Sequence, residues 1–149
     1  MSSLCWKYGI KKLRPVLETT DIFIINESGW KILREESKNN IEAPTDILGY
    51  GPSTVIITKG SKGCEIHDDK KSLEIAIPKI LVKQFKIIDP TGAGDGFSAG
   101  LIKKLLEGKS LREAVDYAQV VAVITCSRIG ASPSFPTLKE VEKIMEKEI

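Results

Sequence analysis

One short segment, Asp-Pro-Thr-Gly-Ala-Gly-Asp-Gly-Phe-Ser-Ala-Gly at residues 89–100, carries the residue types best suited to chemistry in this chain. The small residues Gly92, Ala93 and Gly94 directly precede the carboxylate of Asp95. Small residues let backbone N–H groups approach a ligand closely, and a helix start attracts anions through its unpaired donors and its dipole. A carboxylate there would repel a phosphate, so its presence calls for a function. The natural function is to take the proton of a hydroxyl that attacks the phosphate. The segment therefore predicts phosphoryl transfer with Asp95 as the base.

A plain structural interpretation of the same segment also stands: a glycine-rich strand-to-helix turn in which Asp95 only occupies the helix end. Competing catalytic motifs are excluded by spacing. No Gly-x-x-x-x-Gly-Lys-Ser/Thr loop occurs, and a dinucleotide fingerprint would need a glycine where Phe97 stands. Serine-hydrolase chemistry lacks a Gly-x-Ser-x-Gly motif, and His67 is the only histidine of the sequence.

Two further polar segments follow apolar runs and could meet the first one. Thr-Lys-Gly-Ser-Lys-Gly at 58–63 comes after the run at 54–58, and Asn26-Glu27 comes after the run at 22–25. Ligands of open α/β sheets gather beyond the carboxyl ends of the strands, so these segments and the 89–95 turn are expected to converge. Taken alone, 58–63 is best interpreted as a simple turn into a hairpin, and Glu27 is equally a plain acidic residue at a helix start.

The elements that position these segments alternate along the chain. Apolar, β-branched runs at 22–25, 54–58 and 86–88 predict buried strands, with helical segments between them. This pattern predicts an α/β fold: an open, mostly parallel sheet with helices on both faces and an inserted β-hairpin at 64–67 and 73–77.

Three C-terminal helices are expected to follow that sheet. The first carries an apolar face, and the second begins at Ser110 with a capping box to Glu113. The third begins near Thr137, with Glu140 three residues on. The residues expected to face inward on the first helix are Phe97, Leu101, Ile102 and Leu105, and those on the third are Leu138, Val141, Ile144 and Met145.

Composition limits the function classes. At 149 residues, 42% hydrophobic and 28% charged, the chain fits one globular domain. The net charge of +2 is spread among interspersed lysines and glutamates, which excludes a nucleic-acid interface. The longest apolar run, 120–124, is too short for a bilayer, so a cytoplasmic protein without a membrane partner is expected. Its isolated cysteines (Cys5, Cys64 and Cys126) predict no zinc site.

The 89–95 segment resembles the Asp-Thr-x-Gly-Ala-Gly-Asp signature of the ribokinase-like (PfkB-type) carbohydrate kinases, with Pro90 where that family usually has Thr. The resemblance covers about residues 21–149 and only the C-terminal half of those enzymes. It implies an ATP-dependent phosphotransferase that acts on a hydroxyl of a sugar or related small molecule. It also implies that the N–H groups at 92–94 bind the γ-phosphate and that Mg²⁺ bridges the phosphates.

The resemblance also implies roles for residues outside this turn. The family's Thr-x-Gly-x-x-Gly element beside ATP is matched by Thr58, Gly60 and Gly63. Its Asn-x-x-Glu element, which organises Mg²⁺ through water, is matched at Asn26 but has Gly29 in place of Glu.

Four weaker matches complete the set of implied ligand contacts. Glu27 lies near that metal element, and Asp89 is implied to fix the turn or to contact the water shell of the metal. Gln119 takes a position near the adenine, with an exposed helix residue as the alternative. The Gly-Ala-Ser-Pro-Ser loop at 130–134 is similar to one that borders a monovalent-cation site in some members.

The resemblance predicts a helical lead-in at 1–20 and the nucleotide-binding half at 21–149, with the N-terminal substrate and lid half absent. Three interpretations stay open. The chain is part of a sugar kinase and inactive alone; or it pairs with a separate N-terminal half, or self-associates, to form an active kinase; or it is a nucleotide-binding or structural module derived from such a kinase.

Overall fold

In the computed structural model, residues 2–37 and 40–148 are described, with backbone alone at 2–9, 147 and 148. The chain divides into two compact units, an N-terminal unit of Met1–Ala76 and a C-terminal unit of Ile77–Ile149. The N-terminal unit contains, in chain order, α1 (Ser2–Leu17), β1 (Ile22–Asn26), α2 (Glu27–Glu36), the 3₁₀ helix η1 (Pro44–Tyr50), β2 (Thr54–Thr58), the 3₁₀ helix η2 (Gly60–Lys62), β3 (Cys64–His67) and β4 (Ser72–Ile75).

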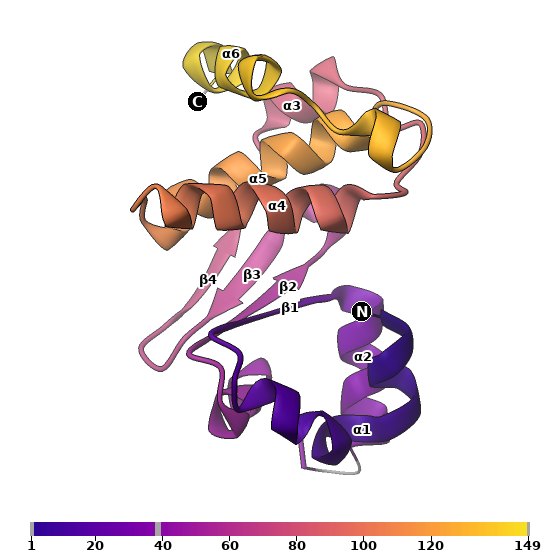
Figure 1. The fold of residues 1–149 in the computed structure, drawn as a ribbon, viewed down its shortest axis with the longest axis vertical. Helices are drawn as coiled ribbons and strands as arrows, with labels where there is room; N and C mark the ends of the chain where they lie inside the picture. Colours follow the sequence, from indigo (N-terminus) through magenta and orange to yellow (C-terminus); the bar gives the residue numbers. More distant parts are fainter. Residues whose placement is uncertain (1, 38–39, 149) are drawn as a thin grey trace. The chain divides into compact units, whose positions relative to one another are not determined.

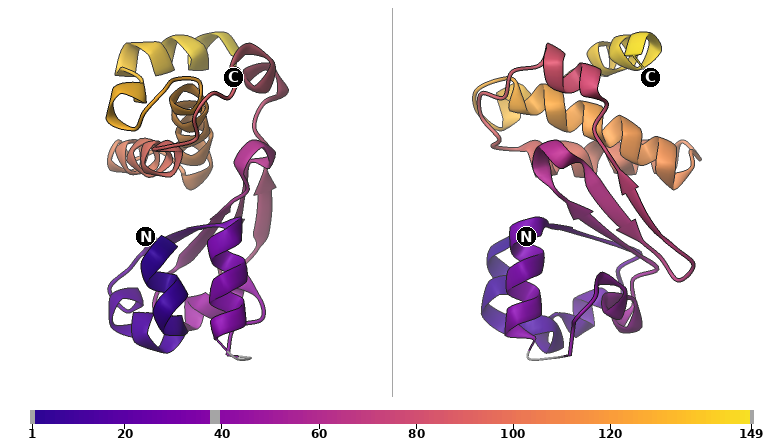
Figure 2. Two further views of the ribbon diagram at one scale, coloured as in Figure 1. Left: turned by 90° about the vertical axis from the view of Figure 1, so that its right-hand side faces the viewer. Right: turned by 180° about the vertical axis from the view of Figure 1, so that it is seen from behind.

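The sheet of the N-terminal unit has the strand order β1-β2-β3-β4 (Figures 1 and 2). β1 and β2 run parallel, whereas β2–β3 and β3–β4 are antiparallel. The predicted open α/β sheet with an added hairpin is confirmed. The expectation of a mostly parallel sheet is wrong for the described strands, because the hairpin joins β2 directly and makes two of the three pairings antiparallel.

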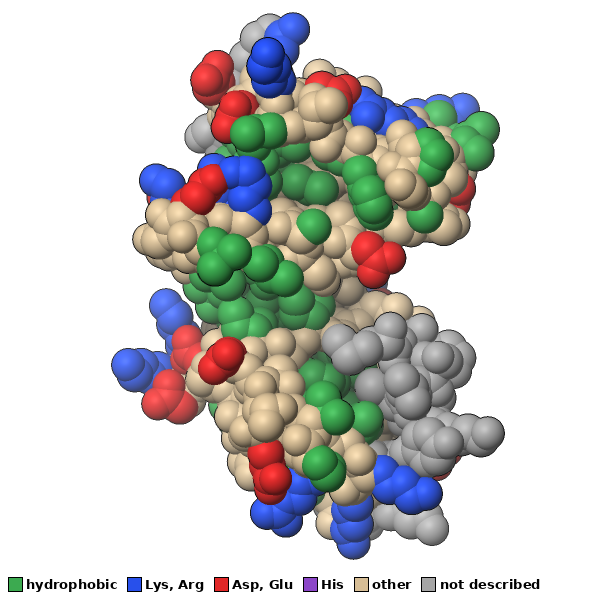
Figure 3. Space-filling view, in the orientation of Figure 1, with side chains coloured by type: hydrophobic (Ala, Val, Ile, Leu, Met, Phe, Trp, Pro, Cys, Tyr) green, Lys and Arg blue, Asp and Glu red, His purple; other side chains and the backbone are tan. Residues whose placement is uncertain are grey.

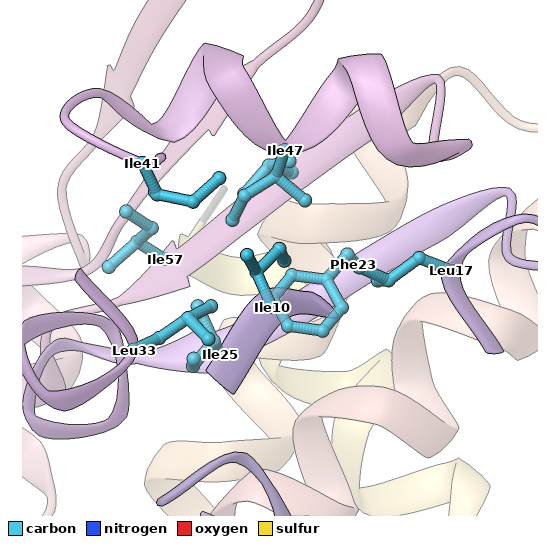
Figure 4. Packing of buried hydrophobic residues seen from close by; sticks show 9 residues of the cluster. Ile10, Leu17, Phe23, Ile25, Leu33, Ile41, Ile47 and Ile57 are labelled. Carbon is cyan, nitrogen blue, oxygen red and sulfur yellow. The ribbon is translucent and has the colours of Figure 1, made fainter. Parts of the chain in front are cut away.

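One face of this sheet is covered within the unit itself. Helices α1 and α2 lie side by side, and their buried side chains meet alternate residues of β1 and β2 (Figure 4). Phe23 stands beside Val55 and Ile25 beside Ile57 in the parallel register, so the period of two places all four on one face. The buried cluster comprises Ile10, Leu17, Phe23, Ile25, Leu33, Ile41, Ile47, Val55 and Ile57.

The C-terminal unit is helical. It contains α3 (Lys79–Gln84), α4 (Ala93–Leu106), α5 (Leu111–Cys126), the 3₁₀ helix η3 (Ser132–Ser134) and α6 (Leu138–Glu148). α4 lies against α5 closely because Gly96 and Gly100 lack side chains, and a Cβ on Gly100 would lie 3.1 Å from Ala118 Cα. The predicted capping box is present: Ser110 N–H donates to Glu113 Oε2 at 3.0 Å, and Glu113 N–H donates to Ser110 Oγ at 3.3 Å.

Three expectations are wrong in this unit. Residues 86–88 form no strand: the N–H groups of Ile88 and Asp89 donate to Cys126 O at 2.7 and 3.1 Å, so the C-terminal carbonyl of α5 takes the place of a neighbouring strand. Ile102 and Leu138 were expected inward but are 54% and 46% exposed. Helix α3 was missed because its six residues are too few to show a helical period.

Candidate functional site

The parallel strands β1 and β2 bring two predicted site residues side by side. Asn26 and Thr58 are register partners at the carboxyl ends of these strands, as the sequence predicted. Gly29 N–H donates to Asn26 Oδ1 at 2.7 Å, so the amide caps the start of α2. Glu27 is exposed, and among the described residues its carboxylate receives no hydrogen bond.

The glycine at position 29 and the Asn26 cap depend on each other. Gly29 is buried, and a Cβ built on it would lie 3.0 Å from both Asn26 Oδ1 and Ile25 Cγ1. A side chain there would press on the capping amide, because such separations are tighter than ordinary carbon contacts. Asn26 thus serves the helix start in this chain, and the position where the resemblance expects a glutamate has no room for one without a shift.

The loop after β2 is shaped mainly by its own packing. Lys59 N–H donates to Gly63 O at 2.7 Å, and Gly63 N–H donates to Gly60 O at 3.0 Å. Gly63 is buried at φ +95°, where a Cβ would lie 2.0 Å from Ile75 O of β4. Gly60, at φ +56°, is exposed and has open space around it. Packing therefore accounts for Gly63, whereas Gly60 and the half-buried Thr58 remain accessible.

Lys59 is part of an ion-pair network. Its ammonium pairs with Glu65 and lies 3.7 Å from Glu74. The hydrogen bond with Glu65, together with the negative charges of Glu65, Glu74 and Glu27, raises the pKa of Lys59 above its usual value. The lysine fastens the loop to the hairpin, which residue spacing could not show because register places Glu65 and Glu74 opposite each other.

The turn before α4 has a different character. Gly92 adopts the left-handed conformation at φ +83° and caps α4. Ala93 N–H donates to Pro90 O at 3.1 Å, and Gly92 O accepts Gly96 N–H at 2.8 Å. Within the described chain no acceptor faces the N–H groups of Gly92 and Gly94. These two donors are available to an anion, and that of Ala93 is already in use.

Asp95 follows these donors in the first turn of α4. Its side chain is exposed and makes no hydrogen bond or ion pair with any described residue. It lines a cavity of about 260 Å³ between α4, α5 and residues 135–141, whose other lining residues are apolar except Lys103. Hydrophobic side chains reach the surface between α4 and α6 (Figure 3). The carboxylate is therefore free to act on a ligand from a largely apolar surrounding.

Asp89 holds the turn in place. Thr91 N–H donates to its Oδ1 and Gly130 N–H to its Oδ2, both at 2.9 Å. Hydrogen bonds from the Thr91 hydroxyl and from these backbone groups hold the pKa of Asp89 below its usual value. Burial of the nearby Cys126 thiol raises the pKa of that thiol, and the negative charge of Asp89 raises it further. The side chain thus links the turn to Gly130, and its contact with the water shell of a metal stays a prediction.

Two weaker candidates lie elsewhere in the C-terminal unit. Gln119 is 2% exposed on α5, so the alternative of an exposed helix residue is wrong. The 130–134 loop is closed by Ser134, which is fully buried and donates from Oγ to Ala131 O at 2.6 Å.

The predicted site residues divide between the two units. Asn26, Glu27, Thr58, Gly60 and Gly63 lie in the N-terminal unit. Asp89, the 92–95 turn and Gln119 lie in the C-terminal unit. Across residues 2–37 and 40–148, no group of three or more His, Cys, Asp or Glu side chains is arranged to hold a metal ion. None of the helices in that part of the chain has the length and apolarity to span a bilayer.

Comparison with known proteins decides the family. Residues 6–138 match the pfkB family carbohydrate kinase description, which is most of the sequence. The chain belongs to the pfkB family. Ribokinase of Haemophilus influenzae is 33% identical to it over 137 residues, an alignment that covers 88% of this chain and 42% of that enzyme.

Solved structures of pfkB relatives share the fold. The nucleoside kinase of Methanocaldococcus jannaschii matches with a TM-score of 0.81 at 28% identity, covering 96% of this chain and 45% of that one. Ribokinase of Arabidopsis thaliana, solved with ribose and ATP, matches with a TM-score of 0.75 at 27% identity and covers 89% of this chain and 43% of that one. This pfkB chain thus spans less than half the length of these relatives and matches their C-terminal part.

Proposed function

We propose that this chain supplies the ATP-binding and catalytic-base part of a kinase that transfers the γ-phosphate to a hydroxyl of a sugar or related small molecule. The observation that carries the proposal is the start of α4. There, two backbone donors without acceptors in the described chain, on Gly92 and Gly94, stand beside the free carboxylate of Asp95. N–H donors at a helix start bind phosphate oxygens, and a free carboxylate beside them can accept the proton of an attacking hydroxyl.

In the proposed reaction the protein contributes charge stabilisation and proton removal. The N–H groups of Gly92 and Gly94 would donate to oxygens of the transferring phosphoryl group, whose charge spreads in a loose transition state. Ala93 N–H would join them only on leaving Pro90 O, its present acceptor. Asp95 would accept the proton of the attacking hydroxyl as the oxygen–phosphorus bond forms.

ATP as the donor is supported by the ribokinase of Arabidopsis, which was solved with ATP. In this chain Thr58 and Gly60 are the accessible residues of the loop after β2, so we assign nucleotide contacts to them. Gly63 would act by holding the turn, because it is buried against Ile75 O. Gln119 is the least supported contact with the nucleotide, since its side chain is 2% exposed.

Magnesium can be tested against the donors present. Mg²⁺ in kinase sites keeps several waters and takes one or two carboxylates besides the phosphates. Asn26 and Asp89 already accept backbone N–H groups. Glu27, whose carboxylate receives no hydrogen bond from a described residue, is therefore the one that fits contact with a metal-bound water. When bound, the ion would neutralise negative charge on the phosphates.

A second candidate function is a nucleotide-binding module without turnover. The absence of a carboxylate at Gly29, with the capping use of Asn26, favours it, because the N-terminal unit then offers little to organise a metal. The acceptor molecule, self-association and pairing with a separate N-terminal half belong to the first proposal alone.

The deciding experiment measures binding and turnover on the same preparation. ATP affinity is measured by calorimetry with and without Mg²⁺, and ATP consumption by a coupled assay with a panel of sugars and nucleosides. Light scattering records whether the chain self-associates. Turnover supports the kinase, and binding without turnover supports the module. A chain that binds no ATP contradicts both.

A further inference from the structure

Asp89 joins two loops of the C-terminal unit that are distant in the sequence. Its two carboxylate oxygens accept different N–H groups: Oδ1 that of Thr91, inside the glycine turn, and Oδ2 that of Gly130, 41 residues further along the chain. Hydrogen bonds to an ionised carboxylate are stronger than neutral ones. The side chain therefore ties the glycine turn to the 130–134 loop.

The 130–134 loop packs against the glycine turn. A Cβ on Gly92 would lie 3.2 Å from Ala131 Cα and 3.4 Å from Phe135 Cε1, so the backbone of Gly92 rests almost directly on this loop. The 130–134 loop is itself held in shape, because the hydroxyl of buried Ser134 donates to Ala131 O. The left-handed conformation of Gly92 is thus supported by this loop, and its N–H and that of Gly94 have no acceptor in the described chain.

We propose that Asp89 is a positioning residue that makes anion binding by the glycine turn depend on the 130–134 loop. The inference rests on the proposed function, because the bound anion would be a phosphate group of the nucleotide. Without the carboxylate, the turn loses its link to Gly130, and the Gly92 and Gly94 donors no longer hold one direction. Asp89 acts through the turn and does not touch the reacting atoms.

The test is an amide-resolved titration of the full chain with pyrophosphate and, separately, with ATP, using ¹⁵N-labelled protein. The variants are Asp89→Ala and Asp89→Asn. The matched control is Asp68→Ala, because Asp68 Oδ1 likewise accepts two backbone N–H groups, of Lys70 and Lys71, each at 2.8 Å in the hairpin turn. The melting temperature of every variant is recorded.

In the wild type, the Gly92 and Gly94 amide signals are expected to shift and saturate. Asp89→Ala should weaken the affinity about tenfold, because the anion must then order a turn that the charge-assisted hydrogen bonds of Asp89 no longer hold. The affinity of Asp89→Asn should lie between those of the wild type and Asp89→Ala, since its amide keeps one oxygen that can accept a hydrogen bond. Asp68→Ala should lower the melting temperature without changing affinity, which separates positioning from general stability.

Each other result has a clear meaning. A wild type that binds neither anion overturns both the proposed function and this inference. Binding by wild type that Asp89→Ala or, where that variant fails to fold, Asp89→Asn leaves unchanged overturns the inference alone. An equal loss in Asp68→Ala also overturns it, because the effect would then be one of stability.

Discussion

Two glycine-containing turns follow apolar segments in this chain, and they differ in what their glycines do. In the 58–63 loop, Gly63 is committed to packing: it lies against Ile75 O, and its N–H donates within the loop. In the 89–95 turn, Gly92 and Gly94 keep their N–H groups free within the described chain. The charged residues differ in the same sense, since Lys59 is paired and Asp95 is not.

The contrast separates a glycine that serves packing, Gly63, from two glycines whose N–H groups are left for a ligand, Gly92 and Gly94. Both turns have glycines at short spacing, and spacing alone gives them the same interpretation. Only the partners of each N–H and each charge distinguish them. Substitutions at Gly63 and at residues 92–95 should therefore have opposite signatures: loss of stability at Gly63, and loss of ligand binding or turnover at 92–95.

The largest effect is expected at the carboxylate. Asp95→Asn should lower turnover by about two to four orders of magnitude, because general-base help is worth that much. ATP affinity should change little, since the base contacts the acceptor hydroxyl. Coupled ATP-consumption assays measure it, with Asp116→Asn, a half-buried residue of α5 that pairs with Arg112, as the control. Full activity in Asp95→Asn would contradict the assignment.

The next effect concerns the packed turn. Gly63→Ala should lower the free energy of unfolding by about 3 kcal/mol, because it adds left-handed strain and a clash with a backbone oxygen. Gly60→Ala, where nothing lies within 4 Å, should cost about 1 kcal/mol from strain alone. Urea unfolding of both variants measures the difference. Equal costs at the two positions would show that contact with Ile75 does not govern this turn.

A smaller effect with the opposite signature is expected at Gly94. A Cβ at this position meets nothing within 4 Å, so Gly94→Ala should leave stability unchanged or raise it by about 0.5 kcal/mol. Its methyl group would nevertheless crowd a bound phosphate, and ATP affinity should fall severalfold by calorimetry. Gly49→Ala, also in open space, is the control expected to leave affinity alone. Unchanged ATP affinity in Gly94→Ala would count against the turn as an anion site.

The smallest effect is expected at Glu140, which pairs with Arg128 and accepts the N–H of Thr137 at the start of α6. Hydrogen bonds from Thr137 N–H, the Arg128 guanidinium and the Thr137 hydroxyl hold the pKa of Glu140 at about 2, below its usual value of 4.5. Its stabilisation is therefore complete above pH 4.5 and is lost as the pH falls toward 2. Glu140→Gln should cost about 0.5 kcal/mol at neutral pH, the low end for a cap because the pair is exposed.

Thermal unfolding across this acid range measures the loss for Glu140→Gln. Glu146→Gln, on the same helix and without a hydrogen bond to a described residue, is the control. The Glu140→Gln profile should be flatter between pH 4.5 and 2 than that of the wild type. Parallel profiles would contradict the assigned role of Glu140.

Local signals predicted the parts of the fold that local chemistry determines. β2 was predicted with its observed bounds because Thr54–Thr58 is β-branched throughout and buried. The capping box at Ser110 follows from two side chains three residues apart, which need no tertiary partner. The pairing of Asn26 with Thr58 followed from one rule about the carboxyl ends of parallel strands.

The misses share a dependence on partners far along the chain. Apolar residues 86–88 resemble a strand, yet their strand character needs a neighbour, and Cys126 O supplies the acceptor instead. The ion pairs of Lys59 likewise depend on β3 and β4, which place two carboxylates next to it. The link from Asp89 to Gly130 could not be predicted from spacing, because it joins loops on either side of α4 and α5.

The bonds to Cys126 O also set a time scale for the glycine turn. Ile88 and Asp89 donate their N–H groups to the last carbonyl of α5, the most deeply buried helix of its unit. Amide exchange at these two positions therefore requires the end of α5 to open, whereas Gly92 and Gly94 exchange without any opening. Amide protons that exchange slowly, at 88 and 89, thus lie within a few residues of amide protons that exchange fast, at 92 and 94. A bound phosphate should protect only the fast ones from exchange.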